Sequence, residues 1–136
     1  MPEFIAPYIL LSEYVCSHCG QLPPGLKRTS DGDWPQVFEA LFTRFAALRE
    51  AVGHPIDVSG YRCSVRDREV SGLTLSVHGF GLALDLGIAA DEQPSFMHLI
   101  DMVCPYLRVG TNTHPGATHV HIDTGFYISP IYSSSL

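Results

Sequence analysis

Residues 76–85, with the sequence SVHGFGLALD, constrain this chain more than any other segment. Their two glycines suit a tight turn that needs unusual backbone angles. After the turn, leucines alternate with small residues and a single acid, which predicts a strand with the leucines on one face and Asp85 on the other. On that face the neighbours of Asp85 are Ala83 and Gly87, which are small, so the face is expected to stay open. His78, at the mouth of the turn, can reach the Asp85 carboxylate. An imidazole and a carboxylate that meet in this way form part of a ligand set for zinc, although a loop histidine beside a solvated aspartate would give the same pattern.

A second polar segment, THVHIDTG at residues 118–125, has the alternation of another strand. His119, His121 and Asp123 share one face of it, and the two aliphatic residues between them share the other. The aliphatic face is expected to pack on the core. Packing gives no reason for two imidazoles and a carboxylate to align on the opposite face, although a surface strand could carry them without a function.

Together the two segments supply His78, Asp85 and His121 as three protein ligands, and we expect them to hold one zinc ion per chain. Three ligands leave a fourth position for water, which is the open geometry of a catalytic zinc site rather than the closed geometry of a structural one.

The pattern Ser-x-His-x-x-Gly-x-Ala-x-Asp, followed downstream by His-x-His, resembles the D-Ala-D-Ala carboxypeptidase and L-alanyl-D-glutamate endopeptidase group of zinc peptidases. These enzymes share a fold with lysostaphin-type enzymes and the hedgehog signalling domain. The segment VSGYR at residues 58–62 resembles the Ser-Gly-Tyr-Arg segment of the group, and HIDTG at residues 121–125 resembles the His-Val-Asp-x-Gly ending of its small bacterial and phage members. The likeness extends from about Leu11 to Phe126.

The resemblance implies a zinc metallopeptidase that hydrolyses peptidoglycan stem peptides, as a D-Ala-D-Ala carboxypeptidase or an L-Ala-D-Glu endopeptidase. Small members without a signal peptide occur as phage lysis or tail-associated enzymes. The start of this chain lacks the features of a signal peptide, so we expect a protein made in the bacterial cytoplasm. It would act on the cell wall after release or as part of a phage particle.

The resemblance also implies roles for residues beside the metal. His119 would stabilise the oxyanion or help to move a proton, and Ser76 would position the loop around His78 or touch the substrate. Arg62 follows a predicted strand end, where a surface arginine is an equally good interpretation of the sequence alone. With the resemblance, Arg62 would bind the substrate carboxylate or polarise its carbonyl, because a guanidinium matches carboxyl geometry.

The general base is the point at which this chain departs from the family. Relatives often carry an acid three residues before the last ligand, and here that position is Thr118. The neighbouring candidates are His119, Asp123 and His114, of which Asp123 is also suited to orient His121. The missing acid favours an alternative function, a non-catalytic zinc-binding module that recognises cell-wall peptide or a protein partner.

Composition limits the partners. Lys and Arg total 8 and Asp and Glu total 14, giving a formal charge of −6. An acidic chain is a poor candidate for binding nucleic acid, and no apolar stretch is long enough to cross a bilayer. We therefore expect a single domain over residues 1–136 that acts as a monomer on a peptide substrate.

Four cysteines have no evident place in this scheme. Cys16 and Cys19 form one Cys-x-x-Cys pair without a second copy, and Cys63 or His18 could supply a further metal ligand. Reduced, partly buried thiols are the interpretation we favour for Cys16, Cys19, Cys63 and Cys104. A disulfide is an alternative if the protein acts outside the cell.

The remaining pattern predicts an α+β fold with a small antiparallel sheet backed by two long helices. One helix is expected to be capped by Asp33, with Pro35 in its first turn and Gly53 at its end. The other is expected over Asp91–Leu107, with Pro105 breaking its last turn. Further expected elements are a helical turn over Leu11–Tyr14 capped by Ser12, a short helix at 64–71, and strands at 55–60, 82–87, 107–110 and 119–123.

Overall fold

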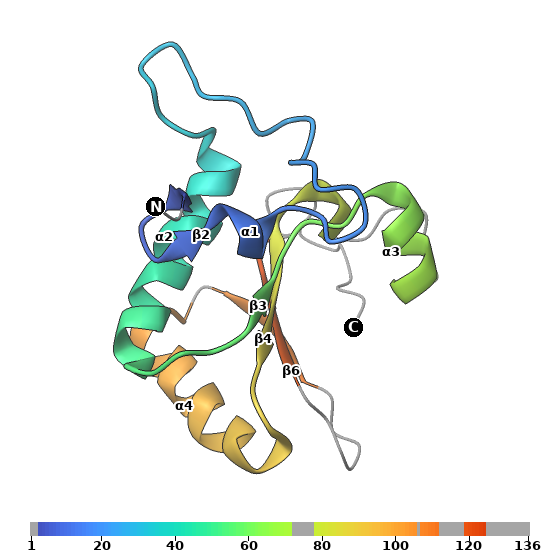
Figure 1. The fold of residues 1–136 in the computed structure, drawn as a ribbon. Helices are drawn as coiled ribbons and strands as arrows, with labels where there is room; N and C mark the ends of the chain where they lie inside the picture. Colours follow the sequence, from blue (N-terminus) through green and yellow to red (C-terminus); the bar gives the residue numbers. More distant parts are fainter. Residues whose placement is uncertain (1–2, 72–77, 106, 112–118, 125–136) are drawn as a thin grey trace.

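The computed structural model describes residues 3–71, 78–105, 107–111 and 119–124 (Figure 1). Its centre is a four-stranded antiparallel sheet in the order β3-β4-β6-β5. The strands are β3 (Val58–Ser59), β4 (Ala83–Gly87), β5 (Arg108–Thr111) and β6 (His119–Asp123), with a separate hairpin of β1 (Phe4–Ala6) and β2 (Ile9–Leu10). The helices are α1 (Leu11–Tyr14), α2 (Gln36–Val52), α3 (Ser64–Ser71) and α4 (Gln93–Val103), with 3₁₀ turns η1 (His78–Phe80) and η2 (Ala90–Glu92).

The two long helices, α2 and α4, lie on the same side of the sheet, and α3 lies on the other (Figure 1). The leucines of β4 and the aliphatic residues of β6 face α2 and α4, as their alternation predicts. The buried residues of this core include Leu84, Leu86, Val120, Ile122, Phe45, Leu48 and Ile100. The predicted α+β fold, with a small antiparallel sheet backed by two long helices, is confirmed.

Helix α2 forms where its apolar stripe predicts, and it ends at Gly53, whose φ of 73° is the left-handed conformation that glycine adopts most readily. Its start differs from the prediction, because Pro35 is the N-cap residue and Asp33 does not cap the helix. The Pro35 carbonyl accepts the N–H groups of Phe38 and Glu39, both at 3.0 Å. The fixed backbone of this proline therefore begins the helix without a side-chain cap.

Helix α4 is shorter than predicted at both ends. Ala90–Glu92 form a 3₁₀ turn before it, and its last residue is Val103. Cys104 leaves the helical conformation with a φ of −147°. The reason is that Cys104 precedes Pro105, whose ring disfavours the helical conformation in the residue before it.

The one-turn helix α1 has the predicted bounds but a different cap. Its N-cap residue is Leu10 rather than Ser12. The Leu10 N–H donates to Glu13 Oε1 at 2.9 Å, and Glu13 also receives two hydrogen bonds from Arg49, each 2.7 Å long. Glu13 therefore supplies the glutamate half of a capping box, in which its carboxylate accepts from the N-cap N–H, and it also ties α1 to α2.

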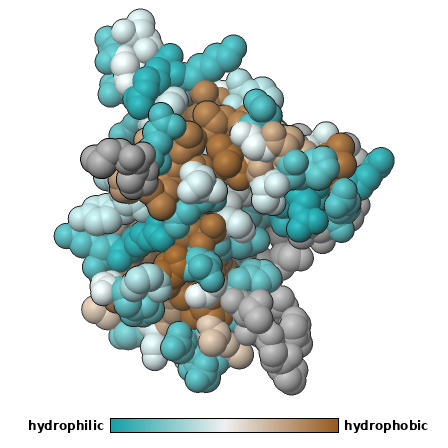
Figure 2. All heavy atoms as spheres, viewed as in Figure 1, coloured by the Kyte–Doolittle hydropathy of each residue, from teal (hydrophilic) through white to brown (hydrophobic). Residues whose placement is uncertain are grey.

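On the face seen in Figure 2, apolar surface gathers toward the middle, and hydrophilic side chains surround it. Within the described part of the chain, none of the helices has both the length and the apolar character needed to span a bilayer.

Candidate metal centre

The register of β4 and β6 brings the predicted site residues together. Asp85 lies directly opposite His121, and Gly87 lies opposite His119. Directly paired residues project to the same face of an antiparallel sheet. His78 reaches this face from η1, and the turn closes where the Gly81 N–H donates to the His78 carbonyl at 3.0 Å. Gly81 has a φ of 78°, so one of the two predicted turn glycines does adopt a left-handed backbone.

Three potential ligand atoms converge on one point. Asp85 Oδ1 lies 3.1 Å from His78 Nε2 and 3.1 Å from His121 Nδ1, and the two nitrogens are 3.2 Å apart. Both imidazoles are almost completely buried, whereas the Asp85 side chain retains about a fifth of its exposure. The metal-binding set predicted from the sequence is thus one compact cluster with its carboxylate toward the open side.

The other nitrogen of each imidazole fixes its tautomer. His78 Nδ1 lies 2.8 Å from the Gly60 carbonyl, and His121 Nε2 lies 2.8 Å from Asp123 Oδ2. Both partners only accept hydrogen bonds, so each of these nitrogens carries the hydrogen and the opposite nitrogen presents a lone pair. Two lone pairs and a carboxylate oxygen that face one another at about 3 Å repel unless a cation lies between them.

The pKa values respond to this arrangement in the direction that favours a cation. Burial raises the pKa of the Asp85 carboxyl, but the contacts of its oxygen with the ring nitrogens of His121 and His78 outweigh burial and hold that pKa well below its ordinary value. Burial lowers the pKa of His121, but Asp123 and Asp85 together raise it above its ordinary value. A proton on His121 can therefore take the place of a metal ion beside Asp85 when no metal is bound.

The triangle of ligand atoms has the dimensions that zinc requires. Zinc binds nitrogen and oxygen at about 2.0–2.2 Å. Three atoms that lie 3.1 to 3.2 Å apart could all bind one zinc ion at these distances. The donor set, the geometry and the tautomers all fit zinc.

Asp123 lies behind His121 and away from solvent. Its side chain is fully buried, and in addition to His121 it contacts Arg108, whose Nε lies 3.3 Å from Asp123 Oδ1. A carboxylate in this position orients the imidazole and raises its basicity as a ligand. Of the two roles that the sequence suggests for Asp123, its surroundings favour the orienting one.

Two hollows meet at Asp85. One, of about 290 Å³, is lined by Arg62 together with Glu13, Ser59 and Tyr61. The other, of about 250 Å³, is lined by His119, Asp57 and Gly87. Arg62 and His119 thus each line a hollow that Asp85 also lines. His119 precedes His121 by two residues and lies on the same face of β6, roughly 7 Å away along the strand. It does not belong to the cluster of three ligand groups.

Three predicted residues lie outside the described part of the chain: Ser76, His114 and Thr118. Two groups that support the metal ligands were not suggested by the sequence: the Gly60 carbonyl, which contacts His78, and Arg108, which contacts Asp123. Gly60 belongs to the recognised Ser-Gly-Tyr-Arg segment, but a carbonyl that accepts from a distant imidazole has no signature in the sequence. Arg108 is placed beside Asp123 by the pairing of β5 with β6, which residue types alone do not predict.

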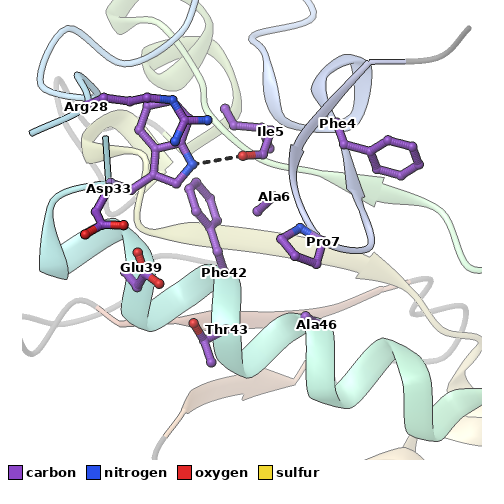
Figure 3. A pocket seen from close by; sticks show the side chains of 11 residues that line it. Phe4, Ile5, Ala6, Pro7, Arg28, Asp33, Glu39, Phe42, Thr43 and Ala46 are labelled. Atoms are coloured by element: carbon purple, nitrogen blue, oxygen red, sulfur yellow. Dashed lines mark hydrogen bonds between the residues drawn. The ribbon is translucent and has the colours of Figure 1, made fainter. Parts of the chain in front are cut away.

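A larger hollow, of about 520 Å³, lies elsewhere. Figure 3 shows it between α2 and the N-terminal hairpin. The Trp34 indole N–H donates to the Ile5 carbonyl at 2.9 Å, and the Arg28 guanidinium lies over the Trp34 ring at 3.9 Å. The residues that line this hollow include none of the predicted site residues. The metal-binding cluster is therefore identified by its chemistry and not by the size of its cavity.

A comparison with protein families gives one match, to the family described as Peptidase M15, over residues 14–123. Neither the curated proteins nor the solved structures include a significant match. The matched region contains the converging ligand atoms, Arg62, His119 and Asp123. Because it covers most of the sequence, this chain belongs to the peptidase M15 family.

Proposed function

We propose that this member of the M15 peptidases uses one zinc ion, held by His78, Asp85 and His121, to hydrolyse peptide bonds in peptidoglycan stem peptides. The observation that carries the proposal is a pair of 2.8 Å contacts, from His78 Nδ1 to the Gly60 carbonyl and from His121 Nε2 to Asp123 Oδ2. Each imidazole is held by a hydrogen-bond acceptor so that its lone pair points to the same place as Asp85. A cluster with only a structural role in packing would not need both orientations.

A zinc ion at this point supplies Lewis acidity, which acidifies water and polarises a scissile carbonyl. The protein contributes position and charge. Asp123 keeps His121 in the ligating tautomer, and the Gly60 carbonyl does the same for His78. Asp85 is the partly exposed member of the set, so a substrate would approach the cluster from the hollows that Asp85 lines.

His119 is the proposed proton carrier. It lines a hollow that Asp85 also lines, and an imidazole exchanges protons near neutral pH. An imidazole nitrogen of His119 would take one proton from the attacking water as the carbon–oxygen bond forms. It would then deliver that proton to the leaving amine as the carbon–nitrogen bond breaks. This assignment gives a base to a chain that has a threonine at position 118.

Arg62 is the proposed substrate-binding cation. Its backbone N–H donates to the His78 carbonyl at 3.2 Å, so its position is tied to a metal ligand. Its side chain lines the other hollow at Asp85. A guanidinium there would pair with a stem-peptide carboxylate and orient the scissile bond.

The reaction type follows from which bond is cut, and two fragments separate the possibilities. A pentapeptide stem that ends in D-Ala-D-Ala would release free D-alanine if the enzyme is a carboxypeptidase. A stem that contains L-Ala-D-Glu would release a new amino terminus on glutamate if it is an endopeptidase. We propose that the enzyme reaches this substrate after release from the cell or on a phage particle.

The test is hydrolysis of these two fragments and of purified peptidoglycan, with products identified by mass. We expect cleavage that stops when a chelator removes the metal and resumes when zinc is added. His78→Ala should lose both the metal at this centre and the activity. If the wild-type protein holds zinc there and cleaves no substrate, it is a binding module. If His78→Ala keeps full metal occupancy, the ligand assignment is wrong.

A further inference from the structure

A second cluster of metal-binding groups lies outside the proposed active site. The sulfur atoms of Cys16, Cys19 and Cys63 all lie within 4.8 Å of one another. Four thiolates around zinc at about 2.3 Å would be separated by roughly 3.8 Å. The three sulfurs therefore need to move by only about 1 Å or less to share one ion.

A fourth ligand is at hand. His18 lies inside the Cys-x-x-Cys turn, and its Nδ1 is 3.5 Å from the sulfur of Cys63. The His18 side chain is exposed, so it can turn toward the sulfurs without disturbing the core. Three cysteines and a histidine form a closed tetrahedral set that is typical of structural zinc.

The backbone around Cys16 is arranged as a thiolate requires. The N–H groups of His18 and Cys63 point at its sulfur, with nitrogen–sulfur distances of 3.4 and 3.3 Å. Both hydrogen bonds place a donor on sulfur, which favours the anionic form. This anion is the form that binds a metal.

We propose that Cys16, Cys19 and Cys63, with His18 as the fourth ligand, bind a second zinc ion whose role is structural. The ion would join the loop after α1 to the segment that leads into α3, and these lie side by side in Figure 1. For these three residues, the proposal takes up the metal-ligand alternative in place of reduced, partly buried thiols. It does not depend on the proposed peptidase activity.

The second ion would lie beside the segment that supports the proposed active site. In the bridged segment, the Tyr61 N–H donates to the Tyr14 carbonyl at 2.8 Å, and the Gly60 carbonyl holds His78. Arg62 directly precedes the ligand Cys63. A zinc ion bound here would hold the Gly60 carbonyl, which orients the proposed ligand His78. It would also hold Arg62, which we propose to bind substrate.

The test uses the full chain purified under reducing conditions and loaded with cobalt in place of zinc. Thiolate ligands give cobalt an intense charge-transfer absorption that nitrogen and oxygen ligands do not, so this band reports on the cysteine cluster alone. We expect the wild type to show the band, Cys19→Ser to lose it, and His78→Ala to keep it. Cys104→Ala is the matched control, because this thiol lies at the end of α4, and it should keep the band in full.

Zinc content provides the second measurement. The wild type should bind about two ions per chain and Cys19→Ser about one. Cys19 is exposed, so its replacement by serine is not expected to unfold the core, and circular dichroism will check this. The proposal is overturned if the wild type shows no thiolate band, or if Cys19→Ser retains both ions. It is also overturned if mass spectrometry of protein purified without a reductant finds a disulfide among the three cysteines.

Discussion

Asp123→Asn tests whether Asp123 acts through His121 or directly on the substrate. Asparagine preserves the shape of the side chain but removes the charge that Asp123 Oδ2 presents to His121 Nε2 across 2.8 Å. A buried hydrogen bond to a charged group contributes about 1.5–3 kcal/mol. Since 1.4 kcal/mol corresponds to tenfold in an equilibrium constant, the loss predicts about 10- to 100-fold weaker zinc binding. Losing a carboxylate partner of a zinc-bound histidine is known to cost a similar amount.

The assay is a competition titration of zinc between the protein and a chromophoric chelator, with activity measured at saturating zinc. We expect the weaker binding at the His-Asp-His site, together with activity that largely recovers when zinc is in excess. Arg108, which also contacts Asp123, is partly exposed, so water can solvate it in the variant and the fold should persist. An Asp123→Asn protein with unchanged zinc affinity and no activity would refute this reasoning and make Asp123 the catalytic base.

Four further predictions follow from named contacts. His119→Ala should lower the rate about 100-fold or more while the metal stays bound, as a lost proton carrier would; full activity would exclude the role. Arg62→Ala should mainly raise KM for stem peptides, with Arg62→Lys intermediate, and unchanged kinetics would make it a surface residue. Gly81→Ala should cost about 2–4 kcal/mol in urea unfolding, because φ is 78° and the added carbon would clash with Pro23. Burial raises the pKa of Glu13, but the hydrogen bonds from Arg49 and the Leu10 N–H, together with the charge of Arg49, outweigh burial and lower that pKa below its ordinary 4.5. Glu13 therefore stabilises the fold above pH 4.5 and stops doing so as the pH falls through its folded pKa; Glu13→Gln should flatten this acid-side loss in unfolding experiments.

The long-range geometry of the metal centre was predictable because two short motifs carry it. Alternation of apolar and polar residues gives the facing of β4 and β6. Burying the leucines of β4 and the aliphatic residues of β6 puts Asp85 and His121 on the same face of the sheet, and the observed register sets them directly opposite each other. The helices were predictable for the same reason, since the apolar stripe of α2 has a single way to face the sheet.

The features that sequence reasoning missed depend on backbone groups or on pairs distant in the chain. The N-caps were misassigned because Pro35 and Leu10 have no side-chain acceptor, and the caps are made by a carbonyl and by Glu13. The cysteine cluster was only one of the alternatives that the sequence left open, because Cys16 and Cys63 are far apart along the chain. Their proximity follows from the pairing of Tyr14 with Tyr61, which has no local signal.

Gly60 connects these observations. A β-carbon at Gly60 would lie 2.9 Å from the Tyr14 ring, 3.1 Å from the Tyr14 carbonyl and 3.2 Å from Leu84. Only a residue without a side chain lets the segment pass this close to α1 and β4, and this passage puts the Gly60 carbonyl within 2.8 Å of His78 Nδ1. Gly60 of the Ser-Gly-Tyr-Arg segment therefore has two roles. Its lack of a side chain lets the backbone pack against Tyr14, and its carbonyl orients the proposed metal ligand His78. The same close passage carries Arg62 to the rim of the centre and Cys63 to the other cysteines, so one backbone approach sets the geometry of both proposed metal sites.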